Sequence, residues 1–386
     1  MKRLLALVLS AAMFFSLAAG CTPADQTDDG QTSPTADAGG EGGYTIATNN
    51  FGVGAYPLDM MVANEQSAAD ATGMTLTVTN NEFTADKVIT QLQNQLAASP
   101  DGVAFLGISE TLFPVAAQYC KNAKTPYVFY ACSPTDEDME KIEQDEYYVG
   151  MVIYSPKNEG ARLAELALAD GCKTAVISAG ASGDYAHDRR LIGFTETFEA
   201  GGGEILFVSH SADPSEAVQK TNDYMTAYGD TDCIYATGED YITPAADVIK
   251  SRGITDCKIY GSNISPSVCQ LIMDGQVEAC TGGEFVCGSL AVTLLINYLD
   301  GNPIKDADGT APYFDNLTQF MVTAENAEDF YEFLSDENLA THTISDEEYQ
   351  NLLVRNNPDV DYDYFYDFLT NYEENVYAKV EVNAAQ

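Results

Sequence analysis

From Tyr44 onward, short apolar runs rich in β-branched and aromatic residues alternate with longer amphipathic stretches. In the stretch 86–98, Val88, Ile89, Leu92 and Leu96 recur at helical spacing. Further helices are predicted over residues 156–169, 189–200, 214–228 and 241–251. Strands are predicted over residues 44–48, 74–79, 102–108, 127–131, 148–153, 174–178, 205–209, 233–236, 258–260 and 277–280. This alternation predicts an α/β fold, and because ten strands exceed one doubly wound domain, two parallel-sheet lobes are expected.

The segments that follow these strands are polar. They are rich in Gly, Ser, Asn and acidic residues and contain few basic residues, as in Asn49-Asn50 and Gly238-Glu239-Asp240. Ordinary turns have the same composition, so no single loop is informative. Because ligands of doubly wound sheets bind outside the carboxyl ends of the strands, the loops together predict a polar, neutral-to-acidic cleft.

Aromatic and hydrogen-bonding residues in these loops are the candidate ligand contacts. Aromatic faces can sandwich the apolar face of a sugar or a nucleobase. Amides offer paired donors and acceptors, and carboxylates accept hydrogen bonds from hydroxyls or an amine. The predicted ligand-binding residues are Asn49, Asn50, Phe51, Tyr56, Ser109, Tyr185, Asp188, Arg189, Glu239, Asp240 and Asn263. Two have structural alternatives, since Phe51 can pack within its loop and Asp188 can cap a helix that begins near Arg189.

The first 21 residues have the pattern of an export signal. Lys2 and Arg3 precede an uncharged run over residues 4–19, which is shorter than the roughly 20 residues of a membrane-spanning helix. Ala18-Ala19-Gly20-Cys21 resembles the end of a bacterial lipoprotein signal, which implies cleavage after residue 20 and a lipid on Cys21. The alternative is an ordinary secretory signal. Residues 21–43 are polar and Gly-rich, so we expect a flexible acidic linker that holds the body at the outer face of the cell membrane.

Charge and motif content argue against several function classes. Lys and Arg number 18 against 59 Asp and Glu, a formal net charge of −41, so no nucleic acid partner is expected. The sequence has no metal-ligand spacing, no Gly-x-Ser-x-Gly and no Gly-Lys-Ser/Thr phosphate loop, so we predict no metal, no cofactor and no enzyme. The eight cysteines besides Cys21 are expected as buried free thiols, with disulfides as the alternative.

Three passages resemble the type I periplasmic binding proteins, the group that includes ribose and galactose receptors and the ligand domains of lactose-type repressors. Arg190-Leu191-Ile192-Gly193-Phe194 resembles the helix that opens the second lobe of this family. Residues 235–253 resemble its strand–loop–helix, and residues 274–301 resemble its turn, return strand and following helix. The order and spacing of these passages carry the resemblance, which covers residues 45–326.

The resemblance implies a division of the chain into two lobes. Residues 44–153 with 284–312 would form lobe one, and residues 154–283 with 313–323 would form lobe two. A three-strand hinge would join them and close them on a ligand. Residues 324–386 extend beyond the family's fold, and their alternating acids and aromatics predict a helical extension packed on the lobes with the aromatics inward. A monomer is expected.

The resemblance implies capture of a small polar, sugar-like solute for the permease subunits of an ABC importer. Asp188 stands where sugar-binding members have Arg, Gly238 where they have Asn, and Asn263 where they have Asp. A sensor that presents bound solute to a receptor kinase or chemoreceptor would have the same architecture. A nucleoside-like ligand is a further alternative, and the sequence does not separate these functions.

Overall fold

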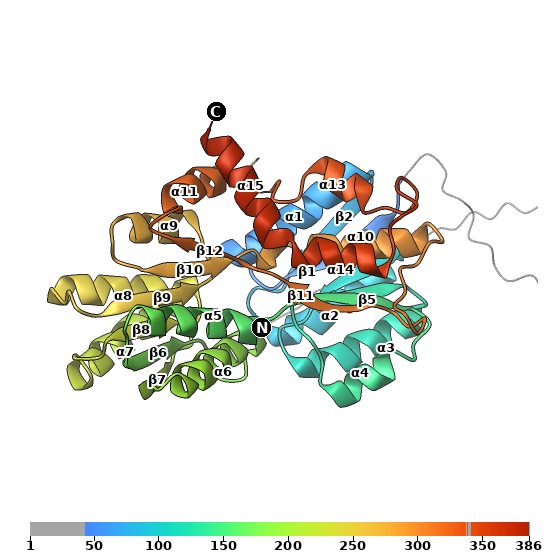
Figure 1. Cartoon of the computed structure of the whole chain (residues 1–386). Coiled ribbons are helices and arrows are strands. Elements are labelled where there is room, and N and C mark those ends of the chain that lie inside the picture. Colours follow the sequence, from blue (N-terminus) through green and yellow to red (C-terminus); the bar gives the residue numbers. More distant parts are fainter. Residues whose placement is uncertain (1–42, 337, 339–340, 386) are drawn as a thin grey trace, which may run out of the picture. The chain divides into compact units, whose positions relative to one another are not determined.

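The computed structural model describes residues 43–336, 338 and 341–385. Their strands and helices alternate through two six-stranded sheets (Figure 1). The predicted signal over residues 1–20, the lipidation site Cys21 and all but the last residue of the predicted linker lie outside the described residues. Within the described part of the chain, no helix is long and apolar enough to cross a membrane.

The first sheet, lobe one, has the strand order β11-β5-β4-β3-β1-β2, and its strand pairs are parallel. Its strands are β1 (Thr45–Asn50), β2 (Thr75–Asn80), β3 (Gly102–Leu106), β4 (Tyr127–Tyr130), β5 (Tyr148–Tyr154) and β11 (Tyr313–Leu317). Its helices are α1 (Tyr56–Thr72), α2 (Ala85–Ala97), the 3-10 turn η1 (Glu110–Leu112), α3 (Phe113–Ala123), α4 (Asp136–Ile142) and α10 (Cys287–Leu299). The central strands β3, β4 and β5 are buried throughout, as is typical of a parallel sheet covered on both faces.

The second sheet, lobe two, has the order β12-β10-β9-β8-β6-β7, in which only the edge strand β12 is antiparallel to its neighbour. Its strands are β6 (Thr174–Ala179), β7 (Glu204–His210), β8 (Cys233–Ala236), β9 (Lys258–Ser262), β10 (Ala279–Gly282) and β12 (Phe320–Thr323). Its helices are α5 (Pro156–Ala169), α6 (Tyr185–Ala200), α7 (Pro214–Ala227), α8 (Glu239–Arg252) and α9 (Pro266–Met273). The predicted fold of two doubly wound lobes is confirmed.

Three helices of lobe two begin with the same two-residue signal. Ser155, Asp213 and Ser265 are the N-caps of α5, α7 and α9, and each accepts a hydrogen bond from a backbone N–H of the first turn. The proline after each cap has a φ angle that suits a helix. Because proline has no backbone N–H, it adds no unpaired donor to the first turn. Because β5 and β9 end within three residues of their caps, the loops at their carboxyl ends are short and fixed.

The chain passes between the lobes three times. β5 runs into α5 at Ser155, β10 runs through Gly283 and the 3-10 turn η2 (Glu284–Val286) into α10, and β11 runs through Thr318 and Gln319 into β12. Gly283 has a φ angle of +109°, a left-handed conformation that favours glycine. These crossings form the expected three-strand hinge.

Two boundaries differ from the sequence-based prediction. Residues 313–317, assigned from the sequence to lobe two, form β11 in lobe one, because they pair with β5 and satisfy its outer edge before the chain crosses. The helix predicted from Arg189 begins at Tyr185, because the Asp184 side chain accepts hydrogen bonds from the N–H groups of Ala186 and His187. Asp188 therefore lies inside α6 and does not cap it.

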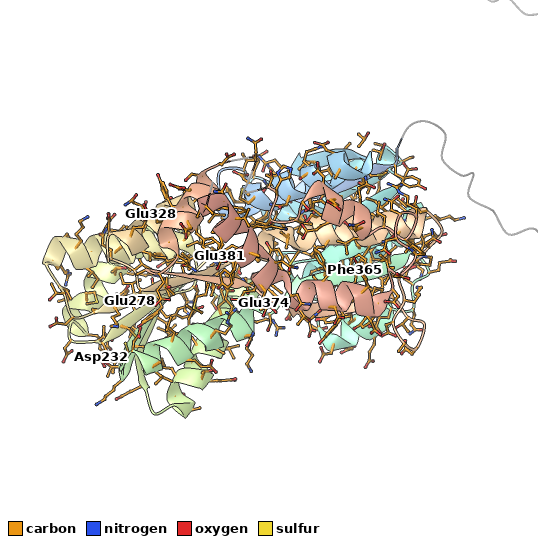
Figure 2. The ribbon with its side chains drawn as sticks, turned by 45° about the horizontal axis from the view of Figure 1, so that its top comes forward. Asp232, Glu278, Glu328, Phe365, Glu374 and Glu381 are labelled. Atoms are coloured by element: carbon orange, nitrogen blue, oxygen red, sulfur yellow. The ribbon has the colours of Figure 1, made fainter. Side chains whose placement is uncertain are left out.

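Residues beyond β12 form a helical C-terminal extension, as predicted. Its helices are α11 (Ala327–Ser335), α13 (Asp346–Asn351), α14 (Tyr362–Thr370) and α15 (Tyr372–Ala384). Figure 2 labels Phe365 on α14 and the exposed acids Glu374 and Glu381 on α15. Phe330, Phe333 and Phe365 are buried against the lobes, whereas Tyr331 and Tyr366 stay exposed.

The eight cysteines of the described part of the chain are all buried free thiols. The same residues contain no group of three or more His, Cys, Asp or Glu that could hold a metal ion.

Candidate ligand-binding cleft

The loops at the carboxyl ends of the strands of both lobes form the candidate cleft. An ion pair joins Nη2 of Arg189, in lobe two, to Oε1 of Glu110, in lobe one, at 2.9 Å. Tyr185, at the start of α6 in lobe two, is buried in the hydrophobic cluster of lobe one that includes Cys132 and Phe113. The lobes are therefore in contact across the cleft.

Arg190 is a deeply buried charge of lobe two. Its side chain is 1% exposed, and its Nε donates to Oε2 of Glu159 at 2.6 Å. Its Nη1 donates to the backbone carbonyl of Thr237 at 3.0 Å and to Oδ1 of Asn263 at 2.8 Å. Arg190 thus ties α6 to α5 and to the loops after β8 and β9. Such a buried ion pair is sustained only because its remaining polar atoms have partners.

The Arg190 network continues into the hinge through Glu284. Asn263 donates from Nδ2 to Oε1 of Glu284, and Gln319 donates to Oε2 at 3.4 Å. Glu284 lies on the second crossing and Gln319 on the third. Burial raises the pKa of Glu284, and the nearby Arg190 guanidinium partly offsets this rise. A polar chain of side chains therefore connects the candidate cleft to two hinge crossings.

Tyr56 and Glu239 are carried by different lobes. The hydroxyl oxygen of Tyr56, in the first turn of α1, is buried and has no hydrogen-bond partner among the described residues. Burial raises the pKa of Tyr56, and the carboxylates of Glu239 and Glu284 lie near enough to raise it further. Glu239, at the start of α8, accepts a hydrogen bond from Oγ of Ser265 at 2.5 Å. A buried hydroxyl without a partner costs free energy until another group pairs with it, so this position is suited to a polar ligand atom.

The first turns of α6 and α8 carry the other polar side chains of lobe two. The guanidinium of Arg189 stacks over the Tyr185 ring, with its carbon 4.4 Å from the ring centre. Nδ1 of His187 lies 2.9 Å from Oγ1 of Thr237, and burial lowers the pKa of His187, which favours the neutral ring. Asp188 accepts a hydrogen bond from the N–H of Gly183 within its own loop. Asp240 is exposed beside Glu239.

Asn49 and Asn50 are occupied inside lobe one. Asn49 donates to Oδ1 of Asn81 and to the carbonyl of Leu106, and it accepts from the N–H of Leu106. Asn50 donates to Asp59 and accepts from the N–H of Gly52. Both amides therefore join β1 to the segments beside it and hold the following loop.

Phe51 and Ser109 lie in the loops after β1 and β3. The Phe51 ring meets Phe83 edge to face at 5.8 Å, so it packs against its own lobe, as one of the two alternatives expected. Oγ of Ser109 lies 3.1 Å from Oγ1 of Thr111 within the same loop. Both contacts lie within lobe one, and the ligand contacts of Phe51 and Ser109 stay predictions.

The comparison with known protein families agrees with this architecture. Residues 53–303 match the family described as the periplasmic binding protein domain. The chain belongs to this family. The match supports a solute-binding role rather than an enzymatic one and implies a location outside the cytoplasm. No curated protein matches the chain.

Solved structures share the fold of this binding protein at low sequence identity. A periplasmic sugar-binding protein from Pseudomonas fluorescens has a TM-score of 0.72 at 15% identity, over 83% of this chain and 98% of that one. The binding component of the arabinose ABC transporter from Shewanella sp. ANA-3 has a TM-score of 0.68 at 17% identity, over 77% and 97%. A carbohydrate transporter protein from Acidothermus cellulolyticus, in complex with myo-inositol, has a TM-score of 0.65 at 19% identity, over 76% and 99%.

The binding protein brings five of the predicted residues to the region where the lobes meet. These are Tyr56, Tyr185, Arg189, Glu239 and Asn263. Asn49 and Asn50 are instead used within lobe one, and Asp188 is used within its own loop. For all of them, contact with a ligand stays a prediction.

Sequence reasoning assigned no site role to Arg190, Glu159 and Glu284. A signal for Arg190 exists, since it lies four residues before the buried Phe194 and so occupies the inward face of the same helix. Glu159 lies in the first turn of α5, four residues after the hinge residue Ser155. Glu284 directly follows Gly282-Gly283 at the end of the return strand. The sequence did not reveal their mutual contact, because it depends on how three separate segments pack.

Proposed function

We propose that this binding protein captures a small neutral polar solute, sugar-like in chemistry, between its two lobes and delivers it to an ABC permease. The observation that carries the proposal is the unpartnered hydroxyl of Tyr56 in lobe one, near the carboxylates of Glu239 in lobe two and Glu284 on the second hinge crossing. A solute with several hydroxyl groups can pair with a phenol and a carboxylate at once. Such a solute would form hydrogen bonds with both sides of the cleft and so hold the two lobes together.

The charge of the cleft favours a neutral ligand over an anionic one. Arg189 is paired with Glu110 and Arg190 with Glu159, so both arginines already face a carboxylate. Glu239 and Glu284 accept hydrogen bonds from the neutral side chains of Ser265 and Asn263. A phosphate or carboxylate on the ligand would therefore meet like charge, which is unfavourable in a partly buried site.

The relatives of the same fold support the sugar-like assignment by analogy. The Shewanella protein is bound to arabinofuranose, and the Acidothermus protein is in complex with myo-inositol. We extend the proposal to a lipid on Cys21, supported by the lipoprotein-like sequence around it. A sensor that presents bound solute to a receptor kinase would use the same cleft and differs only in its partner.

A thermal-shift screen tests the ligand class. We expect one neutral class, among pentoses, hexoses, inositols, oligosaccharides and nucleosides, to raise the melting temperature of the purified protein. At a ligand concentration 100 times Kd the folded state gains about 2.7 kcal/mol. Sugar phosphates and uronic acids serve as anionic controls and are expected to give no shift. A shift with the anionic compounds alone, or with no compound, would overturn the proposal.

Replacing Tyr56 by Phe tests the residue on which the proposal rests. We expect Tyr56→Phe to weaken binding of the solute found in the screen by roughly fivefold to tenfold, as for one lost hydrogen bond. Without ligand, the variant should melt at the wild-type temperature or above it, because the lost hydroxyl has no hydrogen-bond partner among the described residues. Isothermal titration measures the affinity, and Tyr331→Phe, an exposed change on α11, is the control. Unchanged affinity in Tyr56→Phe would remove Tyr56 from the site.

A further inference from the structure

The C-terminal extension, residues 327–385, packs on both lobes. In lobe two, α11 packs on α9 and α15 packs on β12; in lobe one, α13 packs on α1 and α14 packs on β11. Figure 1 shows α14 and α15 in red beside β11 and β12, the two strands of the third crossing. The extension is therefore placed to affect any movement of one lobe against the other.

The turn between α14 and α15 lies on the third hinge crossing. The N–H of Thr318 donates to the carbonyl of Leu369 at 3.3 Å. Arg162, on α5 of lobe two, donates from Nη1 to the carbonyl of Gln319 at 2.5 Å and from Nη2 to Oε1 of Glu373 at 2.7 Å. The guanidinium thus links lobe two, the crossing and the extension. Separating these groups would break a charge-assisted hydrogen bond.

Tyr372, the first residue of α15, lies against the second crossing. Its side chain is 1% exposed. A Cβ atom added to Gly283 would lie 2.9 Å from Cε1 of the Tyr372 ring, so the ring is in close contact with the backbone of this crossing. The extension therefore contacts two of the three segments that must bend when the lobes move.

The two halves of the extension are joined to each other. Nζ of Lys379, on α15, donates to Oε2 of Glu348 on α13 at 2.5 Å and to the carbonyl of Thr343 at 2.6 Å. α15 packs on lobe two and α13 on lobe one, so this lysine connects helices that rest on different lobes. On the lobe-one side, Arg355 donates to the carbonyl of Thr72 at 2.9 Å. The extension is thus a continuous link from lobe two to lobe one.

We propose that the C-terminal extension is a hinge brace, which limits how far the lobes separate and raises the population of the closed form without ligand. Hinge opening generally breaks little packing at the crossings. In this protein, opening would also have to break the contacts that Arg162 and Tyr372 make with the crossings. The ion pair between Arg189 and Glu110 also joins the two lobes, across the cleft.

A distance measurement between the lobes tests the brace. Spin labels are attached at Glu140→Cys in lobe one and Ser215→Cys in lobe two, both exposed positions, while the eight native cysteines among the described residues are buried. In the ligand-free protein, we expect Arg162→Ala to raise the ratio of long to short interlobe distances by roughly tenfold, as for one lost charge-assisted hydrogen bond. Tyr372→Ala should shift the distribution in the same direction.

Matched controls keep the test specific. Lys157→Ala removes an exposed ion pair on the same helix as Arg162, and Tyr366→Ala removes an exposed ring on α14. Both controls should keep the wild-type distance distribution. Circular dichroism establishes that each variant is folded, and if Tyr372→Ala does not fold, Arg162→Ala decides alone. Folded Arg162→Ala with wild-type distances, or an equal shift in the controls, would overturn the brace.

Discussion

Replacing Arg190 by Met is expected to destabilise the protein by about 3–5 kcal/mol, the cost typical of removing one partner from a buried ion pair. Arg190 is the cation that pairs with the Glu159 carboxylate, and both side chains are almost fully buried. Without the guanidinium, Glu159 keeps a hydrogen bond from Oγ1 of Thr281, and the amide of Asn263 loses its donor. We expect the unpaired charge of Glu159, rather than the lost side-chain volume of Arg190, to set the size of the destabilisation.

Urea unfolding monitored by circular dichroism measures the loss. Arg189→Met is the matched control, because the neighbouring arginine is exposed and its ion pair with Glu110 is exposed as well. Exposed pairs contribute about 0–1 kcal/mol, so Arg189→Met should lose at most that amount. Equal losses in the two variants would contradict the role given to Arg190.

A second variant separates charge from packing at this site. Arg190→Met combined with Glu159→Gln leaves no uncompensated charge in the pair, so part of the lost stability should return. If the double variant is less stable than Arg190→Met alone, shape and hydrogen bonding outweigh charge at this position. The comparison requires no ligand and is independent of the solute.

Elements with strong local signals were predicted closely from the sequence. The strand 233–236 and the helix 156–169 coincide with β8 and α5, since one is a short apolar run and the other begins with the Ser-Pro signal at Ser155. β11 was not predicted. Its sequence, Tyr-Phe-Asp-Asn-Leu, lacks an apolar run, because an edge strand buries only part of its surface.

The candidate site was predicted less completely than the fold. Asn49 and Asn50 were predicted in the loop after the first strand but form the end of β1. Composition also could not show that the Asn49 amide is hydrogen-bonded to Leu106 and Asn81. The start of α6 was missed because residues 185–188, Tyr-Ala-His-Asp, show no apolar period. Arg190 and Glu284 meet through Asn263, and this proximity arises from tertiary packing that no local pattern encodes.

Glu65 gives the second large prediction, which concerns pH. This glutamate on α1 is 0% exposed, and its Oε1 accepts a hydrogen bond from Oγ1 of Thr48 at 3.1 Å. A Cβ on Gly288 would lie 2.3 Å from the same oxygen, so the glycine leaves the space that the carboxyl occupies beside α10. Burial raises the pKa of Glu65 to about 8, above its ordinary value of 4.5. The carboxyl is therefore protonated in the folded protein at neutral pH.

The sign of the pH effect follows from this shift. Below pH 4.5 the carboxyl is protonated in both the folded and the unfolded state, and it imposes no penalty. Between pH 4.5 and about 8 the unfolded chain loses the proton and the folded protein keeps it, so stability falls by roughly 1.4 kcal/mol per pH unit. Above pH 8 the penalty is constant, at about 5 kcal/mol.

Glu65→Gln should remove this penalty while keeping the shape of the side chain. We expect the variant to match the wild type near pH 5 and to exceed it by several kcal/mol at pH 9, measured as free energies of unfolding in urea at both pH values. Glu381→Gln, an exposed change on α15 labelled in Figure 2, is the control and should leave the difference between the two pH values unchanged. A buried carboxyl with a raised pKa produces a gain in stability that grows with pH. If Glu65→Gln differed from the wild type by the same free energy of unfolding at both pH values, Glu65 would instead be ionised in the folded protein.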